Sequence, residues 1–179
     1  TGEQTFELYL VYVYAIEIGW TADDFTTEVK AADGTVMTPG EPHQSGSYVG
    51  YPYLMAPGTY TWSVQPSEAR AAEGYQASQP TSQKLTGSAT WSVTLPQIVS
   101  TGFVVPKGGR VVMHSIPSTT YGQGTLIPGD ADLTGDDSDV YTFRLAAGSS
   151  YIYQAAGDGL VTATGMFKST GATTRYDLT

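Results

Sequence analysis

The chain of 179 residues contains no cysteine and no asparagine, and it has only eight Lys and Arg residues. Without cysteine there are no disulfides, no thiolate catalysis and no Cys-ligated zinc. Without asparagine there is no acceptor for N-linked glycosylation. The basic residues are scattered singly in a chain of net charge −9, so no cluster is present to displace counterions from nucleic acid, which we exclude as a partner. The chain also lacks an apolar run of about 18 residues, which excludes a membrane-spanning helix.

Glycine, tyrosine, serine and threonine take the place of charge, with 21 Gly and 13 Tyr. This composition favours strands and turns over helices. Short alternating runs bounded by Gly and Pro predict an all-β fold. Residues 5–20 alternate over a longer stretch, with the bulkier apolar side chains sharing one face, and predict one long strand that bends or breaks. In two later runs the alternation assigns one face to the core: Tyr60, Trp62 and Val64 in the first, and Trp91, Val93 and Leu95 in the second.

The segment from Pro96 to Gly102 is the best candidate for a domain boundary. We therefore predict two tandem antiparallel β-sandwich domains, 1–97 with the long N-terminal strand and 98–179. A weak internal repeat with a spacing of about 90 residues supports this division, because that length suits tandem sandwiches and is too long for a solenoid. LMAPGTYTW at 54–62 resembles LAAGSSYIY at 145–153, and ATWSVTL at 89–95 resembles TTRYDLT at 173–179.

A second pattern lies in the order of four short motifs. These are Asp33-Gly34-Thr35-Val36, Ala56-Pro57-Gly58-Thr59-Tyr60, Glu73-Gly74-Tyr75 and the alternating run 91–95. In this order they resemble the small prealbumin-like, immunoglobulin-like β-sandwich modules of bacterial surface proteins, which include the Cna protein B-type and carboxypeptidase regulatory-like groups. The resemblance covers about residues 25–96, with a fainter echo in 140–179. It implies an extracellular, cell-surface module with a non-enzymatic stalk or adhesion role.

The sequence departs from that group in its cross-linking chemistry. Cna-like modules often carry an internal Lys–Asn isopeptide bond, which a chain without asparagine does not form. A Lys–Asp version would involve Lys30, Lys84, Lys107 or Lys168. LPQIVSTG at 95–102 is similar to a wall-sorting signal but lacks its Thr-Gly spacing. The opening TGEQTFELYL shows no signal-peptide features, so we expect a mature or excised piece.

The run GDADLTGDDSD at 129–139 is the candidate metal site. Its possible ligands are Asp130, Asp132, Asp136, Asp137 and Asp139. Hard cations such as Ca²⁺ take oxygen ligands from loops of this kind. The run matches the first half of an EF-hand pattern, but Tyr141 stands where the bidentate Glu is required. The alternative, which we prefer for this run, is a solvated acidic turn between strands, because Asp and Gly favour turns. Apart from Ca²⁺ we expect no cofactor.

Three tyrosines in the stretch SGSYVGYPYLMAPG are the candidate ligand-binding residues: Tyr48, Tyr51 and Tyr53. Aromatic rings stack on the apolar faces of sugars, so a glycan is a possible partner. The alternative is that these rings cover the end of a sandwich. A host protein or a neighbouring surface protein is the other possible partner, and the oligomeric state is left open.

No catalytic motif is present. The two histidines, His43 and His114, have no HExxH or G-x-S-x-G context, and no phosphate-binding loop is found. We therefore expect a non-enzymatic extracellular module of a bacterial surface protein. The alternative is a carbohydrate-binding module of a secreted enzyme, which would present the three tyrosines on one exposed face.

Overall fold

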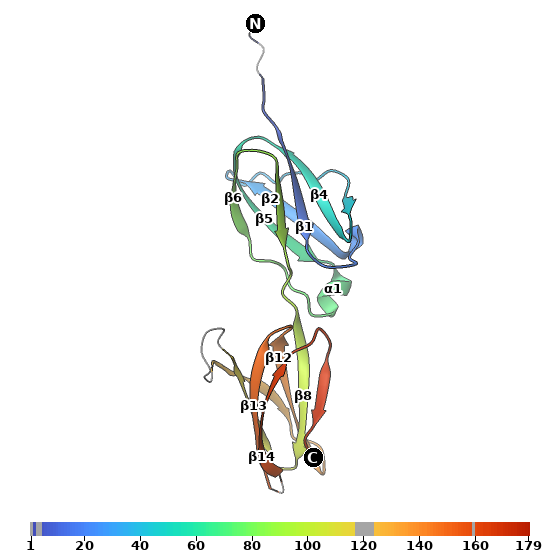
Figure 1. Ribbon diagram of the computed structural model, residues 1–179, viewed down its shortest axis with the longest axis vertical. Helices are drawn as coiled ribbons and strands as arrows, with labels where there is room; N and C mark the ends of the chain where they lie inside the picture. Colours follow the sequence, from blue (N-terminus) through green and yellow to red (C-terminus); the bar gives the residue numbers. More distant parts are fainter. Residues whose placement is uncertain (1, 3–4, 117–123, 159) are drawn as a thin grey trace. The chain divides into compact units, whose positions relative to one another are not determined.

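The computed structural model describes residues 2, 5–116, 124–158 and 160–179. The chain divides into two compact units, Thr1–Pro96 and Gln97–Thr179. Nearly all of the secondary structure is β-strand (Figure 1). The elements of the first unit are β1 Tyr9–Ala15, η1 Ala22–Asp24, β2 Phe25–Ala31, β3 His43–Ser45, β4 Tyr48–Met55, β5 Gly58–Pro66, α1 Glu68–Ala72, β6 Thr81–Leu85 and β7 Ala89–Val93. Those of the second are β8 Ile98–Pro106, β9 Arg110–Ser115, β10 Leu126–Ile127, β11 Gly129–Asp132, β12 Ser138–Ala146, β13 Ser150–Gly157, β14 Leu160–Lys168 and β15 Thr174–Asp177.

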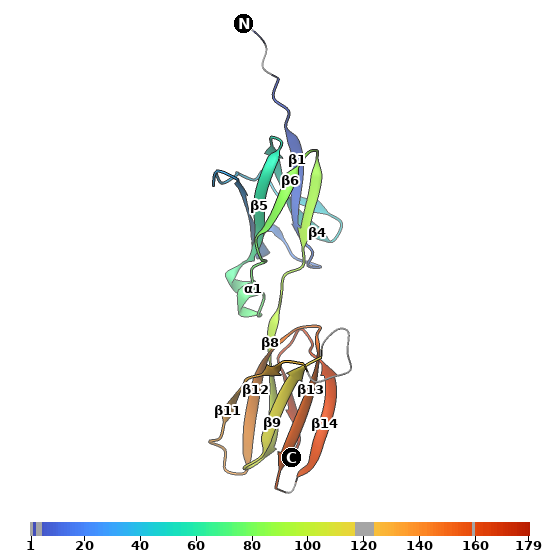
Figure 2. The same ribbon diagram turned by 90° about the vertical axis from the view of Figure 1, so that its left-hand side faces the viewer.

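Each unit is built from two sheets. In the first unit the strand orders are β3-β4-β1-β7 and β2-β5-β6, and in the second they are β11-β12-β8-β15 and β10-β9-β13-β14. Figure 2 shows β9, β13 and β14 side by side in the latter sheet. Apart from the added β10, the order of corresponding strands is the same in the two units. The all-β prediction is confirmed.

The pairing differs from the predicted antiparallel sandwich at one place in each unit. The first and last strands of the first unit, β1 and β7, are neighbours and run parallel. In the second unit β8 and β15 do the same. The other strand pairs in the described residues are antiparallel. Parallel neighbours need a crossover between them, which here passes through the rest of each unit.

The core of the first unit lies between its two sheets. The alternation of β5 buries Tyr60, Trp62 and Val64, which are 6%, 7% and 0% exposed, so this sequence prediction is confirmed. Trp62 stacks on Trp91 of the facing sheet, with ring centroids 5.9 Å apart. The second core is built in the same way, with Phe103 of β8 at its centre, 4.9 Å from the ring of Tyr153 in the facing sheet.

The predicted long first strand is shorter than its alternating sequence. β1 covers only Tyr9–Ala15, and residues 5–8 and 16–20 lie outside it. Its buried face carries Val11, Val13 and Ala15. The bulkier alternate positions face outwards, and Leu10 is 41% exposed. Packing explains this choice, because the large rings of Trp62 and Trp91 already occupy the interior and leave room for small side chains on the strand beside them.

A buried tyrosine fixes the turn between the sheets in each unit. In the first unit the hydroxyl of Tyr60 donates to the carbonyl of Ala56 at 2.8 Å. In the second the hydroxyl of Tyr151 accepts from the amide of Ala146 at 2.9 Å. These two tyrosines are aligned by the repeat seen in the sequence. Each satisfies a backbone group where the chain crosses from one sheet to the other.

Replacing Tyr60 with Phe removes this hydroxyl and leaves the ring in place. We expect the first unit to lose about 1 kcal/mol of its free energy of unfolding, since the hydrogen bond from the buried Tyr60 to the Ala56 carbonyl is lost. Urea denaturation of the whole chain measures the change. Tyr12→Phe is the control, because the Tyr12 hydroxyl forms no hydrogen bond within the described part of the chain. Equal effects of the two variants would contradict the assigned role.

Candidate functional site

The acidic run of the second unit is organised around a lysine. Lys107 lies in the turn between β8 and β9, and its Nζ donates to Oδ1 of Asp139 at 3.0 Å. The same ammonium group donates to the carbonyl oxygens of Leu133 and Gly135. Gly108 donates its backbone N–H to the other carboxylate oxygen of Asp139 at 2.8 Å. The lysine therefore contacts the kind of oxygen atoms that a bound cation would take from this loop.

The five predicted metal ligands do not converge. Asp130 and Asp132 lie on the edge strand β11, and Asp136 and Asp137 are exposed in the following turn. Asp139 belongs to β12 and its side chain is only 4% exposed. In the described residues no group of three or more Asp, Glu or His side chains is placed to hold a metal ion. Residues 129–132 are extended and pair with β12, so the part of the run that matches the EF-hand pattern lies on a strand.

Hydrogen bonds stabilise the charged forms of two of these carboxylates. The Lys107 ammonium and then the Gly108 N–H hold the pKa of Asp139 below its usual range. The side chain and backbone N–H of Thr134 lower the pKa of Asp132, and its Oδ1 accepts from both at 2.6 and 3.0 Å. Hydrogen bonds within the chain thus close the loop. Ca²⁺ binding stays a prediction, and a bound Ca²⁺ ion would compete with the Lys107 ammonium group for the oxygen atoms of the loop.

The three candidate sugar-binding tyrosines do not share a face. Tyr51 and Tyr53 point into the sandwich, whereas Tyr48 lies on the opposite side of β4 because strand side chains alternate. Tyr53 is 1% exposed and its hydroxyl lies 2.7 Å from that of Thr27. Burial raises its pKa. The hydroxyl of Tyr51 donates to the carbonyl of Ala22 at 2.8 Å. The predicted three-tyrosine platform is therefore wrong, since two of its members join the core of the first unit.

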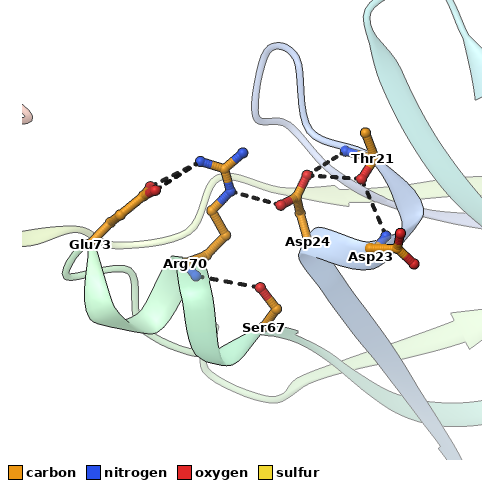
Figure 3. Close-up of polar contacts among 6 residues, drawn as sticks. All are labelled: Thr21, Asp23, Asp24, Ser67, Arg70 and Glu73. Atoms are coloured by element: carbon orange, nitrogen blue, oxygen red, sulfur yellow. Dashed lines mark hydrogen bonds and ion pairs between the residues drawn. The ribbon is translucent and has the colours of Figure 1, made fainter.

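A polar cluster at α1 was not found from the sequence (Figure 3). Arg70 donates through Nε to Asp24 at 2.9 Å and through Nη1 to Glu73 at 2.9 Å. The guanidinium also lies 5.3 Å from the ring centroid of Trp20. These contacts hold the five-residue helix against η1 and the core. The only local signal was the helix cap at Ser67, whose Oγ accepts from the Arg70 amide at 3.4 Å.

Asp24 in this cluster has a lowered pKa. Burial acts in the opposite direction and would raise it, but the Thr21 backbone N–H, Arg70 and the Thr21 hydroxyl together outweigh burial. The arrangement is that of a structural ion pair with a helix cap.

Neither histidine pairs with a carboxylate among the described residues. His43 is exposed on the edge strand β3, with its ring 5.8 Å from that of Tyr12. His114 is half-buried on β9, and its Nδ1 has no hydrogen-bond partner in the described structure. Among the four lysines considered for a cross-link, Lys107 forms an ion pair with Asp139 and Lys30 forms one with Glu28 at 2.7 Å.

Comparison with known proteins gives structural similarities only. No family model and no curated protein matches the chain. The Bacillus anthracis TIE protein is 12% identical with a TM-score of 0.39, and the match covers 95% of this chain and 33% of that one. The fimbrial anchor protein Mfa2 from Porphyromonas gingivalis is 11% identical with a TM-score of 0.37, covering 87% and 82%. The shaft pilin SpaA from Lactobacillus rhamnosus GG is 12% identical with a TM-score of 0.28, covering 97% of each.

These neighbours include a fimbrial anchor and a shaft pilin. The chain spans only a third of the Bacillus anthracis protein. At these identities and TM-scores the similarities carry no argument about function. Within the described residues, no helix is long and apolar enough to cross a membrane.

Replacing Asp139 with Asn tests how much the buried carboxylate contributes to the stability of the fold. A lowered native pKa means that Asp139 stabilises the fold above its unfolded pKa of about 3.9, and that this contribution is lost as the pH falls through the native pKa. We expect the variant to melt at a lower temperature at pH 7 and to lose less stability than the parent between pH 4 and 2. Asp136→Asn, in the turn just before β12 and exposed, is the matched control. Parallel curves for the parent and Asp139→Asn would contradict this role.

Calcium titration tests whether the Lys107 ammonium group occupies the place that a bound cation would take. We expect millimolar Ca²⁺ to leave the melting temperature of the parent unchanged, because the ammonium already contacts the loop oxygens. Lys107→Met keeps the length of the side chain and removes the charge, so its melting temperature should fall and should recover in part with Ca²⁺. Differential scanning fluorimetry with and without a chelator measures both. A rise for the parent that a chelator reverses would instead support the metal site predicted from the sequence.

Proposed function

We propose that the chain is a non-enzymatic, extracellular part of a bacterial surface protein, made of two tandem sandwich modules with a stalk or adhesion role. The observation that carries the proposal is the pairing of the first and last strands in each unit. β1 pairs with β7 in parallel from Val11–Ala89 to Ala15–Val93. β8 pairs with β15 in the same way from Thr101–Thr174 to Val104–Asp177.

Parallel pairing determines how each unit responds to tension. The chain enters a unit at one end of its first strand and leaves at the opposite end of its last strand. A force applied along the chain therefore pulls the two paired strands past each other. All hydrogen bonds between them are then loaded together. If the strands were instead peeled apart, these hydrogen bonds would break one after another. This arrangement suits a module that carries load between its two ends.

The repetition of this pairing supports the tandem arrangement. Both units have the same strand order and the same tyrosine at the crossing between sheets. The absence of thiols and the low content of charge fit a protein whose stability comes from hydrogen-bonded sheets and two aromatic cores. The motif resemblance supports the extracellular location.

We also propose that the chain is not an enzyme. What supports this is the use of its polar side chains: in the described residues, Arg70, Asp24, Lys107 and Asp139 are engaged with one another or with backbone groups. Neither histidine forms a hydrogen bond or an ion pair with a carboxylate in the part of the chain that the structure describes. These groups stabilise turns and caps, which is a structural role.

Single-molecule pulling tests the proposal on the first unit. Because the chain has no cysteine, the double variant Thr5→Cys/Thr94→Cys gives unique handles shortly before the first strand and just beyond the last. We expect a cooperative unfolding event at high force that releases roughly 25–30 nm of chain.

The matched control pulls the same pair of strands in another direction. In Thr5→Cys/Gly87→Cys both handles lie at the same end of the parallel pair, and a side chain at Gly87 meets no atom within 4 Å. The strands are then peeled apart, so the unfolding force should be several times lower. Equal forces in the two directions would contradict the load-bearing role. Failure of antibodies against the chain to label intact producing cells would contradict the surface location.

A further inference from the structure

The outward side of the sheet β3-β4-β1-β7 is uncharged. Strand alternation places Leu10, Tyr12 and Tyr14 of β1 on this side, together with Pro52 and Leu54 of β4 and Thr90 of β7. We call this set the uncharged face. None of the outward positions of the four strands is Asp, Glu, Lys or Arg. Leu10 and Leu54 are 41% and 61% exposed. Contiguous exposed apolar surface of this kind marks interaction sites.

The second unit provides an internal comparison. The strand registers align the two sheets residue by residue. Tyr9 pairs with Met55 in the first unit, as Val99 pairs with Leu145 in the second. Val13 pairs with Trp91 in the first unit, as Phe103 pairs with Tyr176 in the second. Leu54 then corresponds to Arg144 of the second unit, and Thr90 corresponds to Arg175. The positions of Leu10 and Tyr12 are Ser100 and Gly102. The same scaffold thus forms with charged and small residues on this side, so the fold itself does not require the aromatic and apolar residues of the uncharged face.

The ring of Tyr14 lies against the sheet instead of standing away from it. A Cβ at Gly50 would come within 2.5 Å of Cε1 of Tyr14, so the ring packs directly on the backbone of β4. The Tyr12 and Tyr14 rings are tilted by 32° with centroids 6.0 Å apart. Both side chains are half-buried. Their hydroxyls form no hydrogen bond within the described residues, so they are available as donors and acceptors.

We propose that the uncharged face binds a neutral polysaccharide. The C–H-rich face of a pyranose stacks on the π-face of an aromatic ring, while the free hydroxyls of Tyr12, Tyr14 and Thr90 pair with sugar hydroxyls. A neutral ligand suits a surface without charge in a chain of net charge −9, which repels anionic polymers. This proposal specifies a class of ligand for the adhesion role, and it therefore rests on the proposed function.

Affinity electrophoresis of the whole chain tests the site. The gels contain one soluble neutral polysaccharide each (starch, xyloglucan, galactomannan or mixed-linkage β-glucan), with polygalacturonate as the anionic comparison. We expect at least one neutral polymer to retard the chain. Tyr12→Ser and Tyr14→Val, the latter copying Val104 of the second unit, should weaken the retardation by about tenfold or more. Met166→Ser, at an apolar position 71% exposed in the second unit, is the matched control and should migrate as the parent.

A melting curve for each variant separates loss of binding from loss of folding, and only variants that melt as the parent are compared. Retardation by no neutral polymer overturns the proposal, as does retardation that survives both tyrosine substitutions. Sedimentation of the parent as a dimer that either substitution dissociates would assign the face to a second copy of the chain and also overturn it. These results are independent of the pulling experiment, so the polysaccharide site can fail while the load-bearing role stands.

Discussion

The parallel pairing of the first strand with the last is the constraint on which each unit depends. It places the two ends of a unit at opposite ends of one pair of strands, and the remaining strands form the crossover that such pairing requires. In the first unit it also brings Trp91 of β7 beside Val13 of β1, so the same contact that joins the ends of the unit fills its core. Topology and packing therefore come from one interaction.

The two units show how one scaffold supports different surfaces. Their strand orders correspond, and in each a buried tyrosine caps the crossing between sheets. The outward side of the corresponding sheet is nevertheless aromatic in the first unit and carries Arg144 and Arg175 in the second. Buried positions in such a fold are limited by volume, whereas outward positions are free to vary with function. The difference between the units is accordingly informative about binding, and their shared features are informative about stability.

The charged groups of this acidic protein are used sparingly and locally. Lys107 compensates Asp139, a buried carboxylate of the second unit, and Arg70 compensates Asp24 in the first. A buried carboxylate without such a partner would be costly. The remaining acidic residues of the run at 129–139 are exposed to solvent. Solvent therefore hydrates most of the acidic run, and one lysine that is distant in sequence but close in space compensates its buried member.

The sequence by itself determined the all-β class, the inward positions of β5 and the equivalence of Tyr60 with Tyr151, because these depend on local alternation and turn composition. Only the tertiary structure decided which face of β1 is buried, since that choice depends on the volume left by Trp62 and Trp91 from other strands. The parallel end strands and the Lys107 contacts were likewise invisible, because they join segments far apart in the chain. Tyr51 and Tyr53 were assigned to a binding surface for the same reason: the sequence shows alternation, and only the facing sheet shows which side is inside.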